Sequence, residues 1–120
     1  MRKNLMHAVA AIAALAAAAP ASATTYQCTF TQKQSCAAEG CNPVNPSIWV
    51  KLDDAAGIYS RCDSRGCDDH RAVFSYRGAT HSVEIPGAGA FVKFMDGGEA
   101  VEVASQMTMV YVSHGICKVD

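Results

Sequence analysis

Residues 90–104 read Ala-Phe-Val-Lys-Phe-Met-Asp-Gly-Gly-Glu-Ala-Val-Glu-Val-Ala, and this stretch decides the fold class. Two apolar-rich segments, 90–95 and 99–104, flank Asp96-Gly97-Gly98. Short apolar segments bounded by Gly-rich turn signals are typical of β-strands. Asp and Gly both tolerate a positive φ angle, so Asp96-Gly97 indicates a hairpin turn. The stretch therefore predicts two antiparallel strands.

The same pattern continues along the chain. Further strands are expected at 24–31, 47–52, 58–62, 70–76, 79–85 and 107–113. Residues 34–46, 63–69 and 86–89 are expected to be loops, and Ser113-His114-Gly115 a turn, because Gly, Pro and polar residues gather there. About eight strands and no helix after Ala23 favour an all-β fold, either a small antiparallel barrel or a sandwich. The segment 107–112 is apolar on both faces, which indicates a central strand or, alternatively, a face exposed to a partner.

The first 23 residues have the order of a secretory signal peptide. Arg2 and Lys3 precede an Ala-rich apolar run, and Ala21-Ser22-Ala23 predicts cleavage after Ala23. The apolar run is about 12 residues, shorter than the roughly 20 that a membrane-spanning helix needs, so no membrane span is expected in the mature chain. Residues 24–120 have the length of one domain. We expect a periplasmic or secreted protein.

All six cysteines lie in the predicted mature part. An even number of cysteines in a short exported chain indicates disulfide bonds. Six cysteines allow 15 complete pairings, and sequence alone does not select one of them. Spacing favours one long bridge and two local ones: Cys28 with Cys117, Cys36 with Cys41, and Cys62 with Cys67. In the chain-entropy model the long bridge contributes about 4.5 kcal/mol and each local bridge about 2 kcal/mol.

Charge excludes some partners. The predicted mature part has 8 basic side chains against 11 acidic ones, and the basic residues do not cluster with aromatic residues. Neither nucleic acid nor an anionic membrane is favoured by this balance. The partner that we expect is another secreted or periplasmic protein.

The densest polar segment runs from Arg61 to His70. Its possible soft metal ligands are Cys62, Cys67 and His70, and its possible hard ligands are Asp63, Asp68 and Asp69. The Cys-x4-Cys spacing differs from the commoner Cys-x2-Cys of zinc and redox sites, and the carboxylates lack the alternation of a calcium loop. A structural disulfide is therefore the preferred interpretation, and no metal or cofactor is expected. A metal-binding or enzymatic module centred on this segment is the alternative.

Sequence motifs of catalysis are missing elsewhere. No Gly-x-Ser-x-Gly elbow surrounds any serine. Gly87-Ala88-Gly89 lacks the strand-to-helix context of a phosphate loop. We therefore expect a protein that is not an enzyme and has no catalytic residues.

The hairpin at 90–104 supplies the candidate partner-binding residues, Lys93 and Glu99. Lys93 is flanked by apolar neighbours, and Glu99 follows the turn. One interpretation is that Lys93 faces outward and discourages edge pairing between sheets. The other is that the two charges are offered to a partner.

Three short features together resemble the periplasmic inhibitors of c-type lysozyme, which are small exported bacterial β-barrels. These features are the opening Tyr26-Gln27-Cys28, the turn from Lys93 to Glu99-Ala100, and the closing Cys117. The resemblance implies a disulfide-containing barrel that binds lysozyme. Of that family's serine and lysine contacts with the lysozyme cleft, only the lysine can be assigned, to Lys93. The resulting hypothesis is an exported binding or envelope protein without enzymatic activity, in its sharpest form an inhibitor of a secreted hydrolase such as lysozyme.

Overall fold

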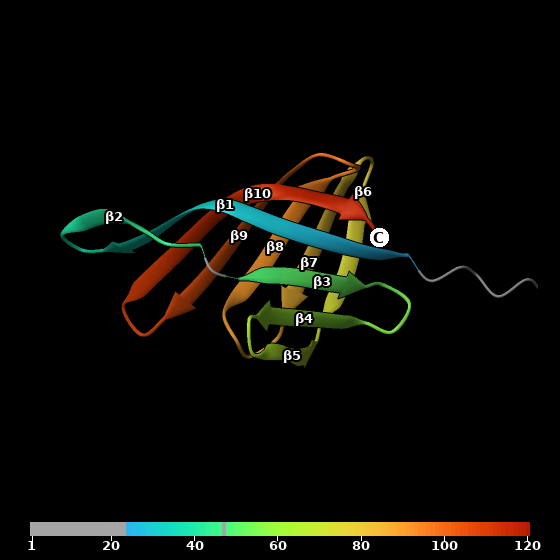
Figure 1. Ribbon diagram of the computed structural model, residues 1–120, viewed down its shortest axis with the longest axis horizontal. Coiled ribbons are helices and arrows are strands. Elements are labelled where there is room, and N and C mark those ends of the chain that lie inside the picture. Colours follow the sequence, from blue (N-terminus) through green and yellow to red (C-terminus); the bar gives the residue numbers. More distant parts are fainter. Residues whose placement is uncertain (1–23, 47) are drawn as a thin grey trace, which may run out of the picture.

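A computed structural model describes residues 24–46 and 48–120, in which it places ten β-strands and no helix (Figure 1). The predicted signal peptide, residues 1–23, lies outside the described residues. The strands are β1 Thr25–Ala37, β2 Gly40–Val44, β3 Trp49–Asp53, β4 Ile58–Asp63, β5 Gly66–Arg71, β6 Val73–Arg77, β7 Thr80–Ile85, β8 Ala90–Met95, β9 Glu99–Gln106 and β10 Met109–Val119. Within this described part, no helix has the length and apolarity needed to cross a membrane.

All paired strands run antiparallel, in the order β5-β4-β3-β1-β10-β9-β8-β7-β6. The first part of β1 pairs with β3, and its last part pairs with β2. The outer strands β5 and β6 are separated in the chain only by Ala72, whose N–H donates to the Gly57 carbonyl at 2.9 Å. The sheet therefore curls into a nearly closed barrel from which the β1–β2 hairpin extends (Figure 1). The all-β prediction is confirmed, in its barrel form.

Alternation along the strands places the core inside the barrel. On β1, for example, Tyr26, Cys28 and Phe30 are buried, whereas Gln27 and Thr29 between them are exposed. β3, β7 and β8 each bury two apolar residues at alternate positions in the same way, and β4, β9 and β10 each contribute one residue to the core cluster. The core cluster comprises Tyr26, Cys28, Phe30, Val50, Leu52, Tyr59, Val83, Ile85, Val92, Phe94, Ala100 and Cys117.

Three disulfides link facing positions of adjacent strands. Cys28–Cys117 joins β1 to β10 inside the core and spans a sequence separation of 89 residues. The other two close the β1–β2 and β4–β5 hairpins; they are Cys36–Cys41 and Cys62–Cys67. This is the pairing that the spacing favours. Three disulfides in a chain of this size fit an oxidising compartment.

Two segments predicted as loops are hairpins instead. Residues 34–46 contain the end of β1 and all of β2, and residues 63–69 contain most of β5. Each hairpin has a short turn followed by a glycine at positive φ, Gly40 at 130° and Gly66 at 145°. Polarity suggested loops, but these strands are exposed on the edge of the sheet and need no apolar face. Cross-strand disulfides hold them in register instead.

The predicted turn Ser113-His114-Gly115 is also wrong, because β10 runs through it. Gly115 lets the backbone of β10 approach that of β1 closely, because an added Cβ would lie 1.9 Å from the Thr29 carbonyl oxygen. β10 lies between β1 and β9, so residues 109–112 of this apolar segment belong to a central strand, but none of them is buried, and Met107 and Val110 are exposed. Met107, at φ 53°, belongs to the preceding turn. The predicted strand 70–76 is divided at Ala72, and the structure has ten strands where about eight were expected.

Candidate functional site

The outer face of β8, β9, β10 and β1 is hollowed into a groove of about 700 Å³, which we call the outer groove. Both predicted partner-binding residues, Lys93 and Glu99, line it. They lie on β8 and β9, the two strands of the predicted hairpin. The structure therefore places these two side chains at one concave site.

The strand register builds the groove from two neighbouring rows of outward-facing residues. In the first row Lys93 pairs with Val101, Val101 with His114, and His114 with Gln32. In the second row Glu99 pairs with Ile116. Because outward-facing residues alternate along each strand, the side chains of both rows project to the same surface.

A bulge in β1 forms one rim of this groove. The register between β1 and β10 shifts between Phe30 and Gln32, which leaves Thr31 as the extra residue. A bulge bends its strand and increases the local twist. The bulge lies beside Gly115, where the lack of a side chain lets the backbone of β10 approach that of β1. Thr31, Gln32 and Gly115 all line the groove.

Charge and apolar surface alternate in the groove. Lys93 Nζ lies 5.8 Å from the centroid of the Phe91 ring, within the range of a cation–π contact. Among the described residues, neither Lys93 nor Glu99 takes part in an ion pair within the chain. Met95 and Ile116 also line the groove and are 45% and 43% exposed. The groove thus offers one positive charge, one negative charge and an apolar floor to a molecule outside the barrel.

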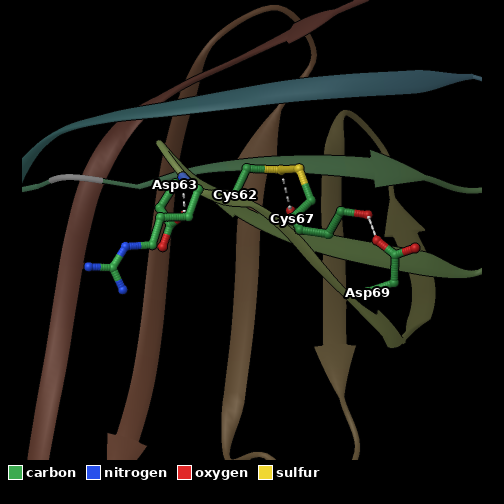
Figure 2. Close-up of a disulfide and its surroundings, with 6 residues drawn as sticks. Cys62, Asp63, Cys67 and Asp69 are labelled. Carbon is green, nitrogen blue, oxygen red and sulfur yellow. Dashed lines mark hydrogen bonds between the residues drawn. A yellow bond between two sulfur atoms is a disulfide. The ribbon is translucent and has the colours of Figure 1, made fainter.

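The segment from Arg61 to His70, the alternative site, forms the β4–β5 hairpin (Figure 2). Cys62 and Cys67 are joined as a disulfide, so their sulfurs are not available as thiolate ligands. Asp63 Oδ1 accepts a hydrogen bond from the Arg65 backbone N–H at 2.7 Å, in the turn. Asp69 Oδ1 accepts one from Ser60 Oγ at 2.5 Å, on the neighbouring strand. These carboxylates therefore have local structural partners.

The register also separates the possible metal ligands that lie close together in the sequence. His70 and Asp68 pair with Tyr59 and Arg61, whose side chains face the barrel interior, whereas Asp69 pairs with the outward-facing Ser60. In the described part of the chain, no group of three or more His, Cys, Asp and Glu side chains is arranged to hold a metal ion.

Sequence reasoning missed a buried polar cluster formed by Tyr59, Arg61 and Glu102. Glu102 on β9 is only 2% exposed. The Tyr59 hydroxyl donates to its Oε2 at 2.5 Å, and Arg61 Nη1 lies 3.7 Å from its Oε1. Burial raises the pKa of Tyr59, and the adjacent carboxylate raises it further, so the hydroxyl keeps the proton that it donates. The alternation of side chains along β9 could have revealed that Glu102 faces inward, since it stands between the inward-facing Ala100 and Ala104.

Lys33 and Ser113 extend this cluster around the barrel wall. Lys33 pairs with Ser113, and Ser113, which is 2% exposed, pairs with Glu102. Burial lowers the pKa of the Lys33 ammonium group, Arg61 lowers it further, and Glu102 opposes both effects. Lys33 Nζ also lies 5.0 Å from the Tyr111 ring centroid. In the described residues no buried side-chain nitrogen or oxygen lacks a hydrogen-bond partner, so this cluster is structurally complete.

Comparison with known proteins adds no relative. No protein-family model, curated protein or solved structure matches the chain.

Proposed function

We propose that this protein acts after export, in the periplasm or the extracellular medium, as a binding protein without enzymatic activity. Its outer groove holds a segment of a partner protein. The partner is a secreted hydrolase of the lysozyme type, which is inhibited when bound. The observation that carries the proposal is the convergence of Lys93 and Glu99 on one groove with an apolar floor.

The composition of the groove suits a protein partner. Interfaces combine a central apolar patch with charged and hydrogen-bonding groups that fix the register. Met95 and Ile116 supply the apolar patch, and Lys93, Glu99 and His114 supply the polar groups. The groove lies on a sheet held by a core disulfide, so little conformational entropy is lost when it binds.

A hydrolase with acidic catalytic residues fits the charge of Lys93. Glycoside hydrolases of the lysozyme type use two carboxyl groups that flank the scissile bond. An ammonium group brought to such a cleft would pair with them and block the substrate. The resemblance to the periplasmic inhibitors of c-type lysozyme supports the same role for Lys93.

The test is inhibition of c-type lysozyme by the purified exported protein, together with capture of partners from periplasm and culture fluid. Lys93→Ala and Glu99→Ala are expected to weaken inhibition by about tenfold each, the size of a contact that contributes between 1 and 2 kcal/mol. Lys51→Ala and Glu84→Ala remove matched exposed charges outside the groove and should change nothing.

Unchanged lysozyme activity at excess protein would contradict the choice of hydrolase. If captured partners bind the Lys93→Ala and Lys51→Ala proteins equally well, the groove itself is not the binding site.

A further inference from the structure

A second hollow, of about 410 Å³, opens at the mouth of the barrel where β1 begins. It is separate from the outer groove, and no lining residue is shared between them. We call it the aromatic mouth and define it by Tyr26, Asp54, Phe74, Tyr76 and His81, all of which line it. These residues come from β1, from the turn after β3, and from β6 and β7.

The walls of the aromatic mouth are held in place by packing. The His81 ring stacks on Phe94 with centroids 4.6 Å apart and an interplanar angle of 6°. The Tyr26 ring lies 5.5 Å from His81, although β1 and β7 are not neighbours in the sheet, so this contact closes the mouth across the barrel. His81 Nε2 also contacts the Asp96 carboxylate. The arrangement exists before any ligand binds.

Tyr76 is the exception among these aromatic side chains. It pairs with His81 and so lies on the inward-facing side of β6, yet it is 79% exposed. Its ring centroid is 6.0 Å from that of His81, with the planes tilted by 44°. A large aromatic ring therefore lies open to solvent beside a concave wall of other rings. Such a face is available to a ligand at little cost in rearrangement.

The electrostatics of the aromatic mouth favour a cation. Asp54 lines it, the Asp96 carboxylate contacts His81 Nε2, and no Lys or Arg is among its lining residues. Burial raises the pKa of Tyr26, and the Asp54 and Asp96 carboxylates raise it further, which means that their negative potential reaches the cavity. Asp54 is fixed by a hydrogen bond from the Thr24 nitrogen to its Oδ1 at 3.1 Å. An anionic ligand would be repelled.

We infer that the aromatic mouth binds a small organic cation of the quaternary ammonium class. The faces of aromatic rings carry partial negative charge and attract such ions, and a nearby carboxylate adds to the attraction. A methylated ammonium ion also presents apolar surface to Tyr26, Phe74 and Tyr76. This site does not depend on the outer groove, so a failure of the hydrolase proposal would leave it standing.

The test is an NMR titration of the oxidised, exported protein with choline, and with its uncharged isostere in which carbon replaces the nitrogen. Cleavage after Ala23 would turn the Thr24 nitrogen into an ammonium group beside Asp54 and offset part of its negative charge, so the exported form tests the proposal under its least favourable electrostatics. Choline should shift the amide resonances of residues 26, 54, 74–76 and 81, and should bind about tenfold more tightly than the isostere.

Two variants sharpen the result. Tyr76→Ala should weaken choline binding about tenfold without unfolding the protein, because the ring is largely exposed, whereas Tyr76→Phe keeps the aromatic face and should retain binding. Asp54→Asn should reduce the preference for choline over its isostere. Equal binding of the isostere, stronger binding of a neutral sugar at the same residues, or no shifts at millimolar choline would each overturn the proposal.

Discussion

The aromatic mouth and the buried polar cluster occupy neighbouring levels of inward-facing side chains in the same barrel. They differ because the polar groups are all paired within the protein, whereas one aromatic ring is left exposed. Along β8 and β9, Phe94 pairs with Ala100 at the aromatic level, and Val92 pairs with Glu102 at the polar level. The two levels are only two residues apart on each strand. The same register therefore supports an open apolar wall and a closed hydrogen-bonded network.

The difference lies in the physics of each level. In the aromatic mouth the rings stabilise one another through contact area, and removing one ring leaves the others with fewer contacts. In the polar cluster each group depends on its partner, because an ionised side chain that is buried without one costs several kcal/mol. The polar cluster is satisfied within the protein, whereas Tyr76 of the aromatic mouth still exposes most of its ring. A complete network indicates a structural role, and an exposed ring in a cavity indicates a binding role.

Phe94→Ala should give the largest loss of stability. Phe94 is 2% exposed and contacts the rings of both Tyr26 and His81. Its truncation removes a fully buried ring and should lower the free energy of unfolding by about 4 kcal/mol, as measured by urea denaturation of the oxidised protein. Choline binding should fall as well, since His81 loses its stacking partner. A loss below about 1 kcal/mol would mean that this level is not closely packed.

Glu102→Ala should disrupt the buried polar cluster and lower the free energy of unfolding slightly less than Phe94→Ala does. The change removes the acceptor for Tyr59 and the counter-charge of Arg61, and we expect a loss of about 3 kcal/mol. Arg61 is about one-third exposed and can turn toward water, which keeps the loss below that of a fully buried pair. Glu99→Ala is the matched control on the same strand; its exposed carboxylate should contribute less than about 0.5 kcal/mol. Similar losses for both variants would contradict the buried role of Glu102.

The sequence was informative about the periodic parts of both levels. Short apolar segments and turn chemistry predicted the strands that carry Phe94 and Glu102, and Asp96-Gly97 predicted the hairpin between them, in which Gly97 has a φ of 62°. Alternation also assigned Lys93 to an outward position. These features are local, so they can be read from a few neighbouring residues.

What could not be predicted depends on contacts between distant segments. β5 has no apolar face to reveal it, and a disulfide and its pairing with β4 hold it to the barrel. The Tyr59–Glu102 hydrogen bond joins residues 43 apart on strands that are not neighbours. The aromatic mouth likewise arises only when β1 and β7 approach each other across the interior. Curvature of the whole sheet, rather than any motif, creates both sites.

Tyr59→Phe is the smallest and most selective change, because it removes only the hydroxyl that donates to Glu102. At neutral pH the loss of one buried hydrogen bond to a charged group should cost about 2 kcal/mol. The pKa of Tyr59 is raised in the folded protein, so the folded state keeps a proton that the unfolded chain loses above about pH 10. This contribution to stability is therefore complete below that pH and decreases by about 1.4 kcal/mol per pH unit above it.

The stability difference between the native protein and Tyr59→Phe should consequently be constant up to about pH 10 and should shrink toward about pH 11. Urea denaturation of both oxidised proteins across this range measures it. Lys33 and Tyr26, whose pKa values are also shifted, are present in both proteins, so the comparison isolates Tyr59. If this stability difference stays constant at high pH, the Tyr59 hydroxyl does not hold its proton against Glu102. The hydrogen bond between them would then not close the buried polar cluster.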